Sequence, residues 1–274
     1  MKKNLIKVED FSYNPTDPRY TFLSLTTKTY PNGHEDEVLK FLPSLSKDRV
    51  GNYYKIIGSN PTTMFTSHLD TADRRQNDTT LYSYVENGEE MIVTDGKSIL
   101  GADDKAGVTV MLYMIANNVP GLYYFFIAEE VGGIGSGDLA NVFDEVDYLK
   151  NIERCVSFDR RDCHSIITKQ LRRDCCSNDF ANALCSEYNK LGFSMKPDNT
   201  GIFTDSAFFM DLIPECTNVS VGYYNEHTSQ ERQNMTHLIK LCSASVSVDW
   251  DSLPTMRSFN ENLKRIRGFK DFEK

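Results

Sequence analysis

The chain has 274 residues, 40% of them hydrophobic and 25% charged, which is typical of a globular protein able to bury a sizeable core. Its formal net charge of −9 argues against a general nucleic-acid-binding protein, since the basic stretch Lys264–Arg267 is short and typical of a solvated helix face. No apolar run approaches the roughly 20 residues of a membrane span, and no apolar segment of a signal peptide follows the N-terminus. We expect no membrane or nucleic-acid partner.

The cysteines indicate the redox compartment. All seven lie from Cys155 onward, and their odd number and irregular spacing suit a reducing environment. The adjacent residues Cys175 and Cys176 are poorly placed for a disulfide or for binding one ion together. We therefore expect a cytoplasmic protein.

The first third of the chain alternates irregular segments with short strands. Residues 1–20 are predicted to be an irregular arm because Pro15 and Pro18 interrupt any helix, and residues 35–42 form a short amphipathic pattern. The dipeptide Asn87-Gly88 is a strong hairpin signal. Strands are predicted at Tyr53–Ile57, Thr63–Ser67, Leu81–Glu86 and Glu89–Thr94.

The rest of the chain alternates helix and strand patterns. Ala106–Asn118 is the clearest helix, and Leu122–Ala128 is a continuous apolar run typical of a strand buried on both faces. This alternation predicts an α/β fold in which helices sandwich a mixed β-sheet, in one domain over residues 1–274. Further strands are predicted at Cys155–Phe158 and Val219–Tyr223, further helices at Asn178–Leu191 and Glu231–Val246, and a C-terminal extension at 251–274.

Several of these predicted strands end in residues that bind metals. His68 and Asp70 follow one strand, and a carboxylate on the far imidazole nitrogen would fix the tautomer of a metal-bound histidine, although His-x-Asp is also a common coincidence. Asp103 and Asp104 open the Ala106 helix between two glycines. They are either a helix cap or a source of a carboxylate that bridges two ions.

The pair Glu129–Glu130 is the hardest to explain without a metal. It ends the most apolar strand of the chain, where two carboxylates would repel each other and be costly to desolvate. The alternative is that both are solvated acids at the end of a strand. Asp159 and His227 also follow predicted strands. Two histidines and three acids at strand ends match the nitrogen and oxygen ligands that zinc accepts.

The order of these motifs is familiar. SHLDT, LGADDKAG, AEEVGGIGS, SFD and GYYNEHT together resemble the co-catalytic zinc exopeptidases, the clan that contains peptidase T and the bacterial leucyl aminopeptidases. The resemblance covers roughly Pro31 to Val246. LGADDKAG followed by EEVG is quite specific, whereas HLD alone is not.

The resemblance implies a role for each residue. His68 and Asp159 would hold one ion, Glu130 and His227 the other, and Asp103 would bridge the two ions, about 3.5–4 Å apart. The remaining implied roles are Glu129 as general base and then acid, Asp70 as the residue that orients His68, Zn²⁺ as the metal with Co²⁺ and Mn²⁺ as alternatives, and a cis peptide between Asp103 and Asp104.

The chain departs from the larger members of this clan. Ordinary strand and helix patterns fill the interval from Asp159 to His227, where peptidase T-like members carry a lid domain. We therefore expect the compact form of the fold and an aminopeptidase that uses a water activated by two metal ions. A carboxypeptidase or dipeptidase, an N-acyl amino acid amidohydrolase, and a non-catalytic protein on the same fold stay as alternatives. The oligomeric state is left open.

Three further residues are candidates for binding the peptide substrate. Tyr223 and Tyr224 lie at the end of a predicted strand, close in sequence to His227, where one hydroxyl would stabilise the oxyanion and the rings would wall an apolar pocket. Asp205 is either a substrate contact in the last loop or a helix N-cap.

Overall fold

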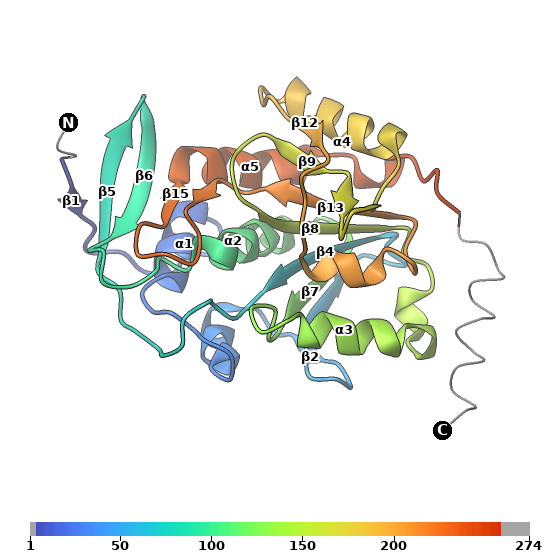
Figure 1. Ribbon diagram of the computed structural model, residues 1–274, viewed down its shortest axis with the longest axis horizontal. Coiled ribbons are helices and arrows are strands. Elements are labelled where there is room, and N and C mark those ends of the chain that lie inside the picture. The colour runs from blue at the N-terminus through green and yellow to red at the C-terminus, as the bar shows by residue number, and fades with distance from the viewer. Residues whose placement is uncertain (1–3, 259–274) are drawn as a thin grey trace.

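An eight-stranded mixed sheet runs through the centre of the computed structural model, which describes residues 4–258 (Figure 1). The strand order is β12-β9-β13-β8-β4-β7-β3-β2, with parallel pairs in the middle and antiparallel pairs at β2–β3, β3–β7 and β9–β13. The strands are β2 (Ser46–Lys47), β3 (Tyr53–Ile57), β4 (Thr63–His68), β7 (Gly121–Phe126), β8 (Arg154–Arg160), β9 (Ser165–Ile167), β12 (Lys196–Asp198) and β13 (Glu215–Ser220).

A second, antiparallel sheet stands at one end of the molecule (Figure 1). Its strand order is β1-β5-β6-β15-β14, so the predicted hairpin of β5 and β6 pairs with segments from both ends of the chain. The strands are β1 (Ile6–Lys7), β5 (Leu81–Glu86), β6 (Glu89–Thr94), β14 (Tyr223–Tyr224) and β15 (Arg232–Asn234), and a separate two-stranded ribbon joins β10 (Lys169–Gln170) to β11 (Arg173–Asp174).

Helices cover the central sheet. The helix α2 packs against β4 and β8, and α1 and α5 pack on α2. The short η4 contacts β4, β8 and β13, and α3 packs against η4. The α-helices are α1 (Pro18–Leu25), α2 (Ala102–Ala116), α3 (Ile134–Asn141), α4 (Asn178–Lys190) and α5 (Met235–Ser247), and the 3₁₀ helices are η1 (Glu35–Phe41), η2 (Phe143–Glu145), η3 (Asp147–Leu149), η4 (Asp205–Phe209) and η5 (Trp250–Ser252).

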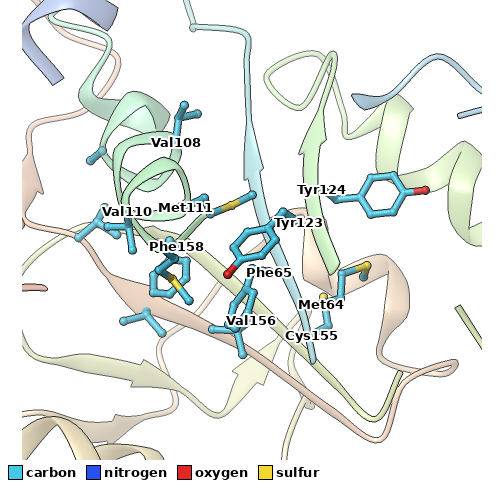
Figure 2. Close-up of a cluster of buried hydrophobic side chains, with 14 of the residues drawn as sticks. Met64, Phe65, Val108, Val110, Met111, Tyr123, Tyr124, Cys155, Val156 and Phe158 are labelled. Atoms are coloured by element: carbon cyan, nitrogen blue, oxygen red, sulfur yellow. The ribbon is translucent and has the colours of Figure 1, made fainter. Parts of the chain in front are cut away.

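The core lies on both faces of β7, which is buried throughout. Tyr123 points toward Phe65 and the α2 side chains, whereas Tyr124 points to the other face (Figure 2). Phe126 is on the same face as Tyr124 and stacks on Phe209 of η4. Because side chains alternate along a strand, an all-apolar strand needs a cover on each face. The predicted α/β fold, with helices around a mixed sheet, is therefore confirmed.

The prediction of an irregular arm over residues 1–20 is correct for residues 8–17 but wrong at two places in the described part of the arm. Residues 6–7 form β1, and α1 begins at Pro18. Proline fits the first turn of a helix, where its missing N–H has no intrahelical partner in any case. The Asp17 side chain caps the helix by accepting a hydrogen bond from the Arg19 backbone N–H at 2.9 Å.

Two other boundaries differ from the sequence prediction near the C-terminus. The predicted strand Val219–Tyr223 is two strands, β13 and β14, since Gly222 has φ +96° and turns the chain from one sheet to the other. The predicted helix Glu231–Val246 begins only at Met235, where Asn234 caps it by accepting from the His237 N–H at 2.9 Å. The preceding residues form β15.

The proposed C-terminal extension is described only in part. Residues 250–252 form η5 and residues 253–258 have no regular secondary structure. The stretch Lys264–Arg267 and the rest of the extension lie outside the described residues. Within residues 4–258, no helix is both long enough and apolar enough to cross a membrane.

Candidate metal centre

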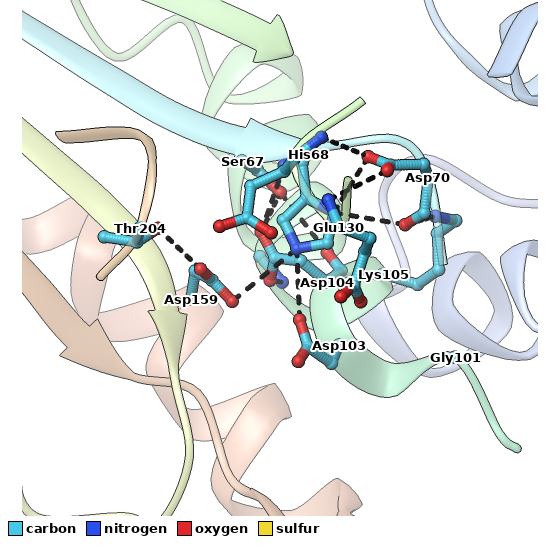
Figure 3. Close-up of polar contacts among 12 residues, drawn as sticks. Ser67, His68, Asp70, Gly101, Asp103, Asp104, Lys105, Glu130, Asp159 and Thr204 are labelled. Atoms are coloured by element: carbon cyan, nitrogen blue, oxygen red, sulfur yellow. Dashed lines mark hydrogen bonds and ion pairs between the residues drawn. The ribbon is translucent and has the colours of Figure 1, made fainter. Parts of the chain in front are cut away.

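The five side chains predicted to bind metal meet at one edge of the central sheet. Figure 3 shows four of them, His68, Asp103, Glu130 and Asp159. His68 is the last residue of β4, Glu130 follows β7 and Asp159 lies near the end of β8. Because these three strands are parallel neighbours, their carboxyl ends reach the same place. Asp103 joins them from the start of α2, and His227 from the loop between β14 and β15.

Asp103 lies between the two histidines. Its Oδ1 is 3.1 Å from His68 Nε2, and its Oδ2 is 3.0 Å from His227 Nε2. Burial acts to raise the pKa of the Asp103 carboxyl, but the interactions with His227 and His68 hold it below its ordinary value. Each oxygen of this carboxylate therefore faces a different imidazole nitrogen, the arrangement required of a ligand that bridges two cations.

The other two acids complete the cluster on either side. Glu130 Oε1 lies 3.1 Å from His227 Nε2, and Asp159 Oδ1 lies 3.8 Å from His68 Nε2. Glu130 Oε1 is buried, and this ion pair with His227 does not have the geometry of a hydrogen bond. A buried carboxylate oxygen among imidazole nitrogens and further carboxylates fits a divalent cation, since nitrogen and oxygen donors of this kind bind zinc and related metals.

The electrostatics of the site also fit cations. Burial raises the pKa of Glu129 to about 8, and burial followed by the charge of Asp103 raises that of Asp159 well above its ordinary value. The neighbouring carboxylates of Asp103 and Glu130 raise the pKa of His227 to about 11. Without added positive charge, the crowded acids therefore retain protons that metal ions would displace.

Asp70 does more than the sequence suggested. It is completely buried, and its Oδ1 lies 3.4 Å from His68 Nδ1, consistent with the predicted orienting role. The same carboxylate accepts hydrogen bonds from the backbone N–H groups of Glu129 and Glu130, each at 3.0 Å. One side chain thus positions a histidine and the two glutamates that follow β7.

Glu231 holds the loop that carries Asp103, and sequence reasoning missed it. This buried side chain accepts hydrogen bonds from the backbone N–H groups of Leu100 at 2.8 Å, Gly101 at 2.7 Å and Asp103 at 3.0 Å. No motif marks Glu231 in the sequence, because its partners lie about 130 positions away and are backbone groups. The Asp103–Asp104 peptide is cis, as the resemblance implied.

Asp104 and Lys105 are buried behind this loop. The Asp104 carboxylate accepts hydrogen bonds from Ser67 Oγ and from the Gly107 N–H, the latter at 3.0 Å, and burial raises its pKa well above its ordinary value. Lys105 Nζ donates to the Leu69 carbonyl at 2.6 Å, and burial lowers its pKa to about 8. Both residues connect the start of α2 to the end of β4.

A cavity of about 400 Å³ opens above the cluster. Tyr223 lines it, with its hydroxyl donating to Asp159 Oδ1 at 3.0 Å. Tyr224 does not line it, because its hydroxyl is 3.2 Å from Cys163 Sγ. The residues around the cavity are Asp103, Glu129, Glu130, Gly132, Asp159, Arg160, Arg161, Ile167, Gln170, Gly201, Ile202, Phe203, Asn218, Tyr223, Glu226 and His227.

Asp205 also lies away from this cavity. It is buried as the first residue of η4, after the cap position Thr204, and its Oδ1 accepts no hydrogen bond from the described residues. Burial raises its pKa to about 7. Thr204 instead donates to Asp159 Oδ2 at 2.5 Å. The structure therefore brings together all the predicted ligands, Glu129, Asp70 and Tyr223, but places Tyr224 and Asp205 outside the cavity wall.

The fold matches those of solved peptidases. The aminopeptidase PepT of Bacillus cereus matches with a TM-score of 0.67 and 16% identity, over 86% of this chain and 98% of that one. A tripeptidase of Staphylococcus aureus gives 0.66 and 17%, over 85% and 97%. The TET1 peptidase of Pyrococcus horikoshii, which can assemble into a tetrahedron or a large octahedral shell, gives 0.63 and 15%, over 84% and 98%.

No protein-family model and no curated protein sequence matches the chain. At identities this low, the structural likeness concerns the fold. At that level it confirms the resemblance read from the motifs, because the matching solved structures include aminopeptidases and a tripeptidase.

Proposed function

We propose that this protein is a metal-dependent aminopeptidase that holds two divalent cations, Zn²⁺ in the first instance, and cleaves a peptide bond next to a free N-terminus. The observation that carries the proposal is Asp103, whose two carboxylate oxygens face His68 at 3.1 Å and His227 at 3.0 Å. Asp159 would complete the ligands of the first ion with His68, and Glu130 those of the second with His227.

When bound, such a pair of ions would polarise the substrate carbonyl and lower the pKa of a shared water. The chain's own contribution begins with Glu129, the proposed general base. In the metal-free chain burial raises its pKa to about 8, and bound cations would lower this pKa and leave the carboxylate free to accept a proton and later return it to the leaving amine. Asp70 would hold Glu129 and Glu130 through their backbone N–H groups.

The remaining residues would position the ligands and the substrate. The Tyr223 and Thr204 hydroxyls both donate to the Asp159 carboxylate, which orients it toward the centre. Glu231 fixes the backbone of Asp103 through the Asp103 N–H. Tyr223 would also form part of the wall of the substrate cavity. Tyr224, whose hydroxyl contacts Cys163, would affect the substrate only indirectly, by supporting the loop that carries His227.

The preference for a free N-terminus follows from charge. The cavity is lined by Asp103, Glu129, Glu130, Asp159 and Glu226, and an acidic wall attracts an α-ammonium group. The competing reading is a carboxypeptidase or an N-acyl amino acid amidohydrolase, for which Arg160 and Arg161 in the same wall would bind a carboxylate.

One peptide in three forms separates these readings: unmodified, N-acetylated and C-amidated. For an aminopeptidase, acetylation should abolish cleavage and amidation should have little effect. The reverse pattern would replace the proposal with a carboxylate-binding hydrolase. Metal analysis of protein prepared without chelator should approach two ions per chain, and saturation at one ion would contradict the bridging role of Asp103.

The cellular location belongs to the same proposal. All seven cysteines are buried and free, and a reducing compartment keeps thiols in this state. A cytoplasmic peptidase acting on peptides, in an oligomeric state still to be measured, is consistent with these features.

A further inference from the structure

We infer that the substrate cavity contains a site for a side-chain carboxamide, so that the preferred substrates carry glutamine or asparagine next to the cleaved bond. This inference rests on the proposed peptidase function and names its substrate class. It is carried by two residues that line the same cavity, Gln170 and Arg160, each of which has a buried polar atom without a hydrogen-bond partner among the described residues: Gln170 Oε1 and Arg160 Nε.

The hydrogen bonds around Gln170 decide which way its amide points. Ser206 Oγ donates to the Thr217 carbonyl at 3.2 Å, and a backbone carbonyl can only accept. The single Ser206 hydroxyl hydrogen is therefore used, and Ser206 Oγ accepts from Gln170 Nε2 at 3.0 Å. The Gln170 side chain, which is 1% exposed, is left with Oε1 as a free acceptor.

Arg160 offers the complementary donor. Its Nη2 donates to Thr200 Oγ1 at 2.9 Å and lies 3.7 Å from Asp198 Oδ2, so one edge of the guanidinium is already engaged. Its Nε–H group is buried and donates to nothing in the described chain. A ligand group that satisfies both Arg160 Nε and Gln170 Oε1 must accept one hydrogen bond and donate another.

A primary carboxamide meets this requirement with its carbonyl oxygen and its NH₂ group. A carboxylate has no hydrogen for Gln170 Oε1, an ammonium group has no lone pair for Arg160 Nε, and an apolar side chain leaves both atoms unpaired. An enzyme site built for hydrogen bonding strongly rejects analogues that leave its buried groups unpaired.

The charge of this wall also favours a neutral side chain. Arg160 is paired with Asp198, and Arg161 with Glu226 at 3.2 Å, so neither guanidinium is left as an uncompensated charge. Ile167 adds an apolar wall for the methylene groups of a glutamine.

Gly201 keeps this wall open and close-packed. A Cβ atom there would come within 2.3 Å of the Lys169 carbonyl oxygen and 2.4 Å of Ile167 Cγ2, so any other residue would displace the segment next to Gln170. The position of Gln170 in the cavity wall therefore depends on the absence of a side chain at Gly201.

The test uses the metal-loaded full chain and the tripeptides X-Ala-Ala, with X glutamine, asparagine, methionine, glutamate, lysine or serine. We expect kcat/KM for glutamine or asparagine to exceed that for methionine and glutamate by roughly tenfold to a hundredfold. Equal or better cleavage of methionine, glutamate or lysine would overturn the inference. A preference for serine, whose hydroxyl also donates and accepts, would assign the site to hydroxyl groups instead.

The variant Gln170→Met keeps the length of the side chain and removes Oε1. It should reduce the glutamine-to-methionine ratio of kcat/KM at least tenfold, and an unchanged ratio would refute the role of Gln170. Gln233→Met is the matched control, since Gln233 is equally buried and also has an unpartnered Oε1, but does not line the cavity. Its ratio should stay at the wild-type value. Arg160→Lys, which lacks the Nε–H group, tests the other half of the site if Gln170→Met fails to fold.

Calorimetric binding of free L-glutamine and L-methionine separates this inference from the proposed function. Tighter binding of glutamine that is lost in Gln170→Met supports the carboxamide site even if no peptide is cleaved. Hydrolysis of all the peptides without selectivity, together with equal binding of the two amino acids, would sink the carboxamide site and leave the peptidase intact.

Discussion

Replacing Asp70 by asparagine should damage the metal centre without touching a proposed ligand. The Asp70 carboxylate accepts from the backbone N–H groups of Glu129 and Glu130, each at 3.0 Å, and lies 3.4 Å from His68 Nδ1. An asparagine keeps one of these oxygens and replaces the other with an NH₂ group, which faces a second donor. One of the two backbone N–H groups then loses its acceptor.

The size of the effect follows from these contacts. A hydrogen bond to a charged group contributes about 1.5–3 kcal/mol, so the free energy of unfolding of the metal-free protein should fall by about this amount. Residues that orient metal ligands typically change metal affinity or activity by about 10–100-fold when mutated. We expect a loss of metal affinity in this range, because both His68 and the backbone of Glu130 are held by the Asp70 carboxylate.

The assay is a metal titration against a chromophoric chelator, with denaturant unfolding of chelator-treated protein alongside. Asp48→Asn is the matched control: the Asp48 Oδ1 atom also accepts backbone hydrogen bonds, from Val50 at 3.0 Å and Gly51 at 2.7 Å, and its Oδ2 accepts from Asn52 Nδ2 at 3.1 Å, a donor that the new NH₂ group would face. It should lower stability with metal affinity unchanged. If the two variants lose the same affinity, the coupling through Asp70 is wrong.

Four further substitutions test other parts of the structure. Glu129→Gln should lower kcat by about 10²–10⁴-fold with metal content retained, whereas Glu130→Gln should lose metal; the opposite result would exchange their roles. Burial raises the pKa of Glu231 to about 8 from an ordinary 4.5. Between these pH values the folded chain keeps a proton that the unfolded chain releases. The stability of the metal-free protein should therefore fall as pH rises through this range. Glu231→Gln should flatten that slope in denaturant unfolding at several pH values, and an unchanged slope would contradict the assignment. Gly107→Ala should destabilise the fold by about 3 kcal/mol or more in the same assay, since its Cβ would meet the Phe158 carbonyl oxygen at 2.0 Å, and a wild-type midpoint would contradict this packing.

Local patterns were sufficient to predict the main elements and the acids and histidines that meet in one cluster. The strand Tyr53–Ile57 and the hairpin of Leu81–Glu86 with Glu89–Thr94 have the bounds expected from their alternation and turn residues. The ligand candidates were found because each follows a strand, and parallel strands end at one edge of a sheet. Their roles at a metal remain predictions.

Errors arose where one segment changes partner. Nothing local shows that β14 leaves the central sheet after Gly222, or that residues 232–234 form a strand before α5 begins. Both features depend on pairing, since β14 pairs with β15 and β15 pairs with the distant β6. Likewise, Pro18 looked like a helix breaker, although a proline in the first turn is compatible with a helix.

The sequence by itself determined the alternation of helices and strands, the mixed sheet, and the acids and histidines at the strand ends, because these depend on periodicity and on residue chemistry. Only the tertiary structure decided that Glu231 accepts hydrogen bonds from the Asp103 loop and that Asp70 accepts them from two backbone N–H groups. It also decided that Gln170 and Arg160, each with an unpaired polar atom, line the same cavity. These contacts join side chains to backbone groups or to a shared space far away in the chain. No residue type or spacing encodes them locally, since they exist only once the strands are paired and the loops are closed.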